Sequence, residues 1–154
     1  MDRVLVGIGT TSPTYQLELS LDSAAKPTSS TWTVPSDERI KEDISIANYS
    51  QCEEIMKNLE LRYYKYKDTI PSYDSTIIPD RRRLGWIAQE VEEVLPKSVR
   101  TIPERHGFNN FKQLDSDQIY AVMYGTIKKL MEDKEDLYNR VNSLSEQIER
   151  MKQV

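Results

Sequence analysis

Ser36 and Lys41 have the residue types of a serine–lysine catalytic pair and lie five positions apart. A serine hydroxyl becomes a nucleophile when a nearby base takes its proton, and a neutral lysine can be that base. The spacing alone does not bring the two side chains together. Five residues separate them by roughly 140° around a helix and place them on opposite faces of a strand. The chemistry therefore requires a bend, which we expect something outside the segment to impose.

The same serine has a structural alternative. Ser36 is a preferred helix N-cap residue, and Asp37 and Glu38 suit the first turn of a helix. From the residues alone, a nucleophile and a cap both stay open.

Other residues with reactive types have simpler explanations. Gly7 and Gly9 lack the third glycine and the helix of a dinucleotide-binding loop. Cys52 lies on the apolar face of a predicted helix and is expected in the core. His106 falls in a predicted loop, and the arginines at 81–83 are expected at a solvated loop edge or in an intersubunit salt bridge. The tyrosines of the central region are expected in a core or interface: Tyr63, Tyr64 and Tyr66.

The composition narrows the class of protein. A net charge of −4 gives no indication of a nucleic acid or membrane partner, and no apolar run at the N-terminus is long enough for a signal peptide or a membrane span. One cysteine and one histidine exclude a disulfide framework and most zinc sites, so we expect no metal and no cofactor. Charged residues are 30% of the chain, which suits a protein that buries apolar surface against copies of itself.

The first 35 residues divide into two parts. Residues 4–21 contain strand formers, and Leu17, Leu19 and Leu21 alternate with polar residues as in a half-buried strand. This segment cannot bury its apolar face alone and needs a partner. Residues 23–35 are rich in serine, threonine, alanine and proline, which is typical of a linker.

Residues 36–114 are predicted to form a small mixed α/β domain. Ser50 and Glu53 have the spacing of a capping box at the start of a helix. An aromatic strand follows at 61–66, and Leu84, Trp86 and Ile87 suggest a second strand. A short helix then ends at Pro96, and the last predicted strand contains Val99 and Ile102.

Residues 115–154 are predicted to form one helix of ~50 Å, capped by Asp115 or Ser116 and weakened only at Gly125. Apolar residues follow a heptad repeat, with a and d positions held over about five heptads. Such a stripe favours a coiled coil over a helix packed on its own domain, and Lys134 at an a position would specify register or strand number. The a and d positions are Tyr120, Ile127, Lys134, Val141 and Ile148, and Met123, Leu130, Leu137, Leu144 and Met151.

Several motifs together resemble one family, the intramolecular chaperone autoprocessing domains of phage and viral tail fibres, endosialidase tailspikes and the animal myelin regulatory factor. The resemblance covers most of residues 4–154. It is carried by Ser36-Asp37-Glu38-Arg39-Ile40-Lys41 with Asp43-Ile44, Tyr64-Lys65-Tyr66, Leu84-Gly85-Trp86-Ile87-Ala88-Gln89-Glu90-Val91, Pro96, and the fibre-shaft-like Val6-Gly7-Ile8-Gly9-Thr10-Thr11-Ser12-Pro13.

That resemblance implies an α+β fold and a self-cleaving serine endopeptidase. Ser36 would be the nucleophile and Lys41 the general base, cleaving the Pro35–Ser36 bond. Asp37 and Arg39 would hold the turn between them. Lys41 would have to be neutral, which burial or a nearby cation such as Arg39 would favour.

The family also implies the organisation of the chain. Residues 1–22 would end a β-structured fibre shaft, 23–35 would be a linker ending at the scissile bond, 36–114 the chaperone domain and 115–154 a trimeric coiled coil. The partners would be two further copies and the upstream fibre portion. Assembly is expected in the host cytoplasm, with the parent protein in the virion. A non-cleaving trimerisation tip and a domain that releases a membrane-tethered transcription factor are the alternatives.

Overall fold

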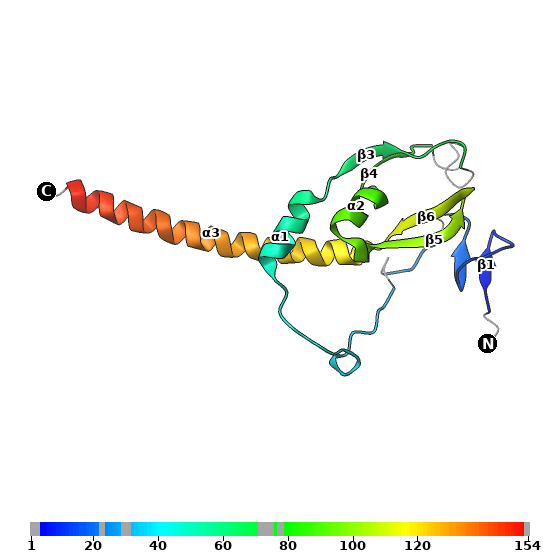
Figure 1. The fold of residues 1–154 in the computed structure, drawn as a ribbon, viewed down its shortest axis with the longest axis horizontal. Helices are drawn as coiled ribbons and strands as arrows, with labels where there is room; N and C mark the ends of the chain where they lie inside the picture. Colours follow the sequence, from blue (N-terminus) through cyan, green and yellow to red (C-terminus); the bar gives the residue numbers. More distant parts are fainter. Residues whose placement is uncertain (1–3, 22–23, 29–31, 71–75, 77–78, 153–154) are drawn as a thin grey trace. The chain divides into compact units, whose positions relative to one another are not determined.

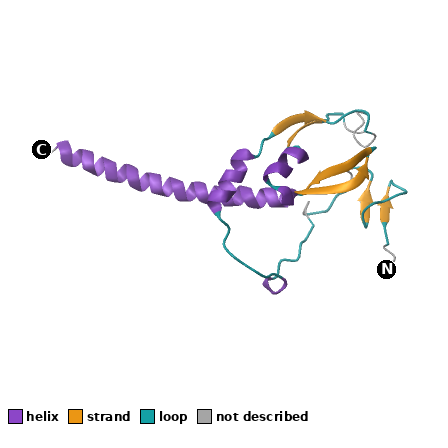
Figure 2. Cartoon of the chain, in the orientation of Figure 1, coloured by secondary structure: helices purple, strands orange, loops and turns teal. Residues whose placement is uncertain are grey.

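The computed structural model describes residues 4–21, 24–28, 32–70, 76 and 79–152. They form two compact units, one of residues 1–44 with 65–81 and the other of residues 45–64 with 82–154. Short strands and helices alternate before a long C-terminal helix (Figures 1 and 2). The predicted mixed α/β fold with a C-terminal helix is therefore confirmed. The expected domain boundaries after residues 22, 35 and 114 stay predictions.

The N-terminal segment is a parallel strand pair, β1 (Val6–Ile8) and β2 (Leu17–Leu19). Each residue of β1 pairs with the residue eleven positions later, so Val6 faces Leu17 and Ile8 faces Leu19. The connecting loop is closed by the Glu18 carboxylate, which accepts from both the backbone N–H and the hydroxyl of Thr14, at 2.7 and 2.9 Å. Most of the aliphatic side chains on these strands remain exposed. The segment is β as predicted, and within the described residues its apolar side is not fully covered.

Helix α1 (Tyr49–Asn58) begins two residues earlier than a cap at Ser50 predicts. Its N-cap is Asn48, whose side-chain oxygen accepts from the Gln51 backbone N–H at 3.1 Å. The capping box of Ser50 and Glu53 is therefore wrong. Ser50 lies inside the helix, and Glu53 forms an ion pair with Lys57 at 2.6 Å one turn later.

Helix α1 packs across the first part of the C-terminal helix α3 (Ser116–Lys152) (Figure 1). At Gly125 the helices are so close that a Cβ atom would lie 2.5 Å from the Cys52 sulfur. Only glycine lets the two helices approach this closely, so Gly125 is a packing residue as well as a weak helix former. Cys52 is half-buried in this contact, as expected of a packed residue. The α3 residues buried in the single chain are Ile119, Val122, Gly125 and Thr126.

Strands β3 (Arg62–Lys65) and β4 (Arg82–Gly85) pair in a two-stranded sheet. The second strand ends at Gly85, before the predicted residues Trp86 and Ile87, and Ile87 is the N-cap of helix α2 (Ala88–Val94). Arg62 of β3 forms an ion pair with Glu90 of α2 at 3.1 Å, which ties the helix to the sheet.

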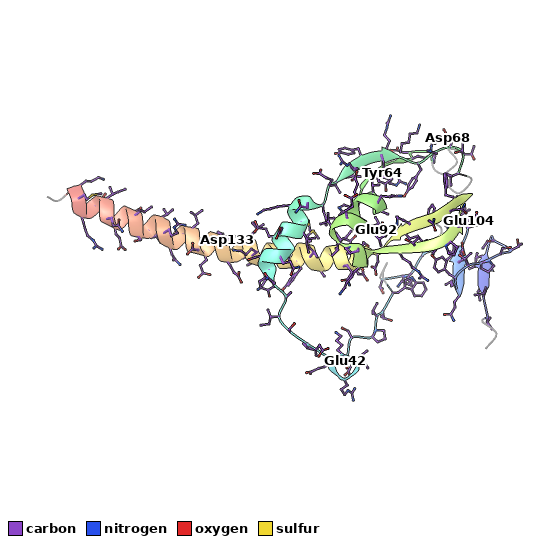
Figure 3. The ribbon with its side chains drawn as sticks, viewed as in Figure 1. Glu42, Tyr64, Asp68, Glu92, Glu104 and Asp133 are labelled. Carbon is purple, nitrogen blue, oxygen red and sulfur yellow. The ribbon has the colours of Figure 1, made fainter. Side chains whose placement is uncertain are left out.

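Arg81 is buried just before β4. It forms an ion pair with Asp68, which Figure 3 labels beside the loop, and donates to the Tyr66 carbonyl oxygen at 3.0 Å. The prediction of a solvated edge or an intersubunit bridge is wrong for Arg81, because its partners lie within the chain.

After α2, a 3-10 turn, η3 (Pro96–Ser98), leads into an antiparallel hairpin of β5 (Val99–Arg105) and β6 (Phe108–Leu114). The predicted strand at Val99 is confirmed, whereas β6 was not predicted. The two-residue turn is His106-Gly107, with φ values of 56° and 79°. Both positive values are those of a hairpin turn whose twist matches the strands. Lys112 of β6 forms an ion pair at 2.7 Å with Glu92 of α2, which Figure 3 labels, so the hairpin is held against that helix.

Helix α3 runs to Lys152, as predicted, and residues 153–154 lie outside the described part. The Asp115 carboxylate accepts from the Asp117 backbone N–H at 3.0 Å, which supports Asp115 as the cap. All a and d positions of the heptad repeat are exposed in the single chain, and so is every described residue from 131 onward. The helix therefore uses one face to pack on α1 and leaves a different, apolar face uncovered.

Candidate active site

A short 3-10 turn, η1 (Glu38–Ile40), separates Ser36 from Lys41. Extended residues flank it, with Asp37 at φ −65°, ψ 138° and Lys41 at φ −121°, ψ 150°. The resulting bend places Lys41 Nζ 2.6 Å from Ser36 Oγ. The expectation of an externally imposed bend is wrong, because the turn lies within the segment itself.

The turn is held by Asp37 and Arg39. One carboxylate oxygen of Asp37 accepts from both the backbone N–H and Nε of Arg39 at 2.9 Å, and the other accepts from Nη2 at 2.8 Å. The Arg39 side chain, and then its backbone N–H, lower the pKa of the Asp37 carboxyl below its ordinary value. Asp37 is thus the N-cap of the turn, and the alternative of Ser36 as a helix cap is wrong. An Asp or Asn whose side chain can bond the backbone two residues later was the sequence signal for this bend.

The pair has the distance that proton transfer requires, but its surroundings are open. All residues from 32 to 48 are exposed, and residues 32–37 have no regular secondary structure (Figure 3, near the labelled Glu42). A lysine acts as a base only when it has a free electron pair, and burial favours that neutral form. The single chain thus supplies the geometry of a serine–lysine pair without its cover.

The other candidate residues are placed in structural roles. His106 is in the hairpin turn, with its ring against Phe111 at 5.8 Å between centroids. Gly9 lies at φ 74° in the loop between β1 and β2. In the part of the chain that the structure describes, no group of three or more acidic, histidine or cysteine side chains could hold a metal ion. Among those same residues, no helix has the length and apolarity to cross a membrane.

Comparison with known proteins bears directly on the segment that contains this pair. Residues 36–100 match the protein-family model described as "Chaperone of endosialidase". The resemblance drawn from the motifs is thereby confirmed for this segment, and Ser36 is its first matched residue.

Two further comparisons found similar proteins. The chain is 27% identical over 116 residues to "Myelin regulatory factor homolog 1" of Caenorhabditis elegans, which is 75% of this chain but 12% of that protein. A solved structure described as "a novel intramolecular chaperon" matches 64% of this chain and 99% of its own, with 17% identity and a TM-score of 0.43. The chain thus spans about an eighth of the length of the curated relative.

Proposed function

We propose that the chain is a C-terminal intramolecular chaperone of a viral fibre or tailspike protein. It holds three copies in register while the upstream portion folds, and then releases itself by cutting the Pro35–Ser36 bond. The observation that carries the proposal is the 2.6 Å contact between Lys41 Nζ and Ser36 Oγ at the start of the matched segment.

The chemistry balances with these two side chains and water. Ser36 Oγ attacks the Pro35 carbonyl carbon while Lys41, when neutral, takes the hydroxyl proton. The C–N bond then breaks, and Lys41 returns the proton to the Ser36 amine, leaving an ester between Pro35 and Ser36 Oγ. Water hydrolyses this ester, so the upstream piece ends in a carboxylate at Pro35 and the released piece begins at Ser36. Each chain performs this reaction once.

The assembly role is supported by the two ends of the chain. The a and d positions of α3 form an exposed apolar seam that a coiled coil would bury. At the other end, the aliphatic side chains of β1 and β2 are also largely exposed, as expected of a strand pair at the end of a shaft. Parallel β-structure built from several chains needs its register fixed, because a slip of one residue turns core faces outward. A local coiled coil forms fast enough to fix it first. The family resemblance supplies the number three, as well as assembly in the host cytoplasm and a parent protein in the virion.

Intact-mass measurement of the purified protein tests the cleavage. We expect a C-terminal piece beginning at Ser36, and a full-length chain for Ser36→Ala. Ser45→Ala is the matched control, because Ser45 is also exposed and lies outside the pair. A wild-type chain that folds, oligomerises and stays intact would instead favour a permanent trimerisation tip.

The relative from Caenorhabditis elegans supports a second candidate, in which the same cleavage releases a transcription-factor portion. The β1–β2 pair favours the fibre, since its open strands suit a β-structured shaft. The identity of the piece upstream of Ser36 in the parent polypeptide separates the two: a β-rich oligomeric shaft supports the fibre, and a DNA-binding portion supports the alternative.

A further inference from the structure

Asp43 lies two residues after Lys41 and has a φ of 54°, in the left-handed region that residues with a side chain rarely adopt. Within the described residues, the other non-glycine residues with a positive φ are His106 and Asn110. Both belong to the β5–β6 hairpin, where the turn and the strand pairing fix the backbone. Asp43 has no sheet to explain its conformation, because residues 41–48 form no regular secondary structure.

The bend at Asp43 lies on a short connection between the candidate base and an anchored helix. Lys41 is extended, and its backbone N–H donates to the Glu38 carbonyl oxygen at 3.0 Å, which fixes the lysine to the η1 turn. Five residues after Asp43, the side chain of Asn48 caps helix α1. The direction that the chain takes at Asp43 therefore decides how the connection leaves the lysine.

No side-chain contact in the described chain offsets the cost of this bend. Asp43 is exposed, and its side chain has neither a hydrogen bond nor an ion pair with any other residue that the structure describes. Aspartate adopts the left-handed region more readily than most residues, although it still costs energy there. Backbone strain of this kind is concentrated at functional sites. The bend thus depends on the residue type at position 43 and lies next to the candidate site.

We infer that Asp43 is a positioning residue for the proposed cleavage. Its left-handed backbone turns the chain directly after Lys41, so that the connection to α1 does not pull the lysine away from Ser36. Asp43 acts through Lys41 and takes no part in the proton transfer itself. The inference rests on the proposed function and deepens it.

The size of the rotation explains why one backbone angle matters. A change of φ from 54° to the ordinary negative range turns the following chain by roughly 110° or more relative to Lys41. Helix α1 is packed on α3, so it does not follow such a rotation freely. The rotation falls instead on the exposed residues between the helix and the turn, Lys41 among them. A displacement of about 1 Å is enough to slow a reaction by up to about a hundredfold.

A series of substitutions separates the backbone of Asp43 from its side chain. Asp43→Gly removes the side chain but adopts a positive φ freely, and Asp43→Asn removes the charge but tolerates the same φ. We expect both variants to cleave close to the wild-type rate. Asp43→Ala disfavours the bend, and we expect it to cleave roughly tenfold more slowly in an intact oligomer. Asp43→Val should be slower still, because a β-branched residue is a genuine outlier at positive φ.

Glu42 supplies the matched control, because it is exposed, carries the same charge and does not have a positive φ. Glu42→Ala should cleave as the wild type does, and Glu42→Gly should cleave no faster. A wild-type rate in Asp43→Ala would overturn the inference. Slow cleavage in Asp43→Gly or Asp43→Asn would overturn it as well, because the reaction would then need the carboxylate and not the bend.

The pH profile and the melting temperature separate positioning from other roles. Asp43→Ala should lower the cleavage rate by the same factor at every pH, and in the uncleaved Ser36→Ala background it should leave the oligomer and the melting temperature unchanged. A shift in the pH of half-maximal rate would contradict the inference, since Asp43 would then act through its charge. A lower melting temperature or a lost oligomer would contradict it too, since the bend would then support the fold. Failure of the wild type to cleave would refute the proposed function and this inference with it, whereas an equally fast Asp43→Ala variant of a cleaving wild type refutes the inference alone.

Discussion

Replacing Leu137 and Leu144 with aspartate tests whether the exposed seam of α3 drives assembly. In the single chain these side chains are 61 and 57% exposed, so a coiled coil has more than half of each left to bury. Full burial of a leucine contributes about 2 kcal/mol, so each contributes about 1.2 kcal/mol on assembly. Six such side chains in a trimer contribute about 7 kcal/mol, or about five powers of ten in the association constant. Aspartates facing one another in the seam would oppose association further.

Sedimentation reports the oligomer and a denaturing gel reports the cleavage. We expect the double aspartate variant to be monomeric at micromolar concentration and to stay uncut, although Ser36 and Lys41 are intact. Asn139→Asp with Asn142→Asp adds the same charge off the seam and should assemble and cleave as the wild type. A soluble monomer that cuts at the wild-type rate would refute the reasoning, since the site would then need no cover from other copies.

Three further outcomes are expected. Lys41→Ala should abolish cleavage while the oligomer persists, and normal cleavage of this variant, measured by intact mass, would remove Lys41 from the mechanism. In the wild type, the cleavage rate should rise with pH until the base is neutral. The pKa of the Asp37 carboxyl is lowered in the folded turn. The ionised carboxylate therefore stabilises the turn fully at pH values above the ordinary pKa of an aspartate, and this stabilisation is lost as the pH falls through the lowered pKa. In an uncleaved variant the NMR shift of the Arg39 amide should therefore titrate with a midpoint below the ordinary pKa of an aspartate, and a midpoint at or above the ordinary pKa would contradict the capped turn. Gly125→Val should destabilise the chain by roughly 1–3 kcal/mol, because its Cβ would lie 2.5 Å from the Cys52 sulfur. Adding Cys52→Ala should restore part of the loss of melting temperature, and no recovery would show that the cost lies elsewhere.

Long-range periodicity made the C-terminal helix predictable. A heptad repeat held over many turns specifies both a helix and an uncovered apolar face, and α3 shows both. Strand β3 was predicted for a related reason, since consecutive aromatic residues fit a pleated surface. Each of these predictions rests on many side chains, so one atypical residue does not change it.

The features that position the site depend instead on single polar atoms. The bend at Ser36 follows from the Asp37 carboxylate bonding the Arg39 backbone, and helix α1 begins at Asn48 through one side-chain oxygen. Strand β6 was missed because its polar residues give no clear alternation, and its pairing comes from the His106-Gly107 turn. Neither local bonding nor pairing partners can be derived from hydrophobic periodicity.

In the proposed function, the separation of geometry from environment would keep the chain from cutting before it has assembled. Because Asp37 and Arg39 build the turn within one chain, the approach of Lys41 to Ser36 cannot itself report that assembly is complete. Exposure can report it, because water around residues 32–48 disperses the charge that develops on the attacked carbonyl. In the proposed trimer the cover would come from other copies, since the single chain leaves residues 32–48 exposed. Control by cover therefore predicts that variants which weaken assembly slow cleavage although the turn is intact, whereas control by geometry predicts that only changes to the geometry of the pair do so.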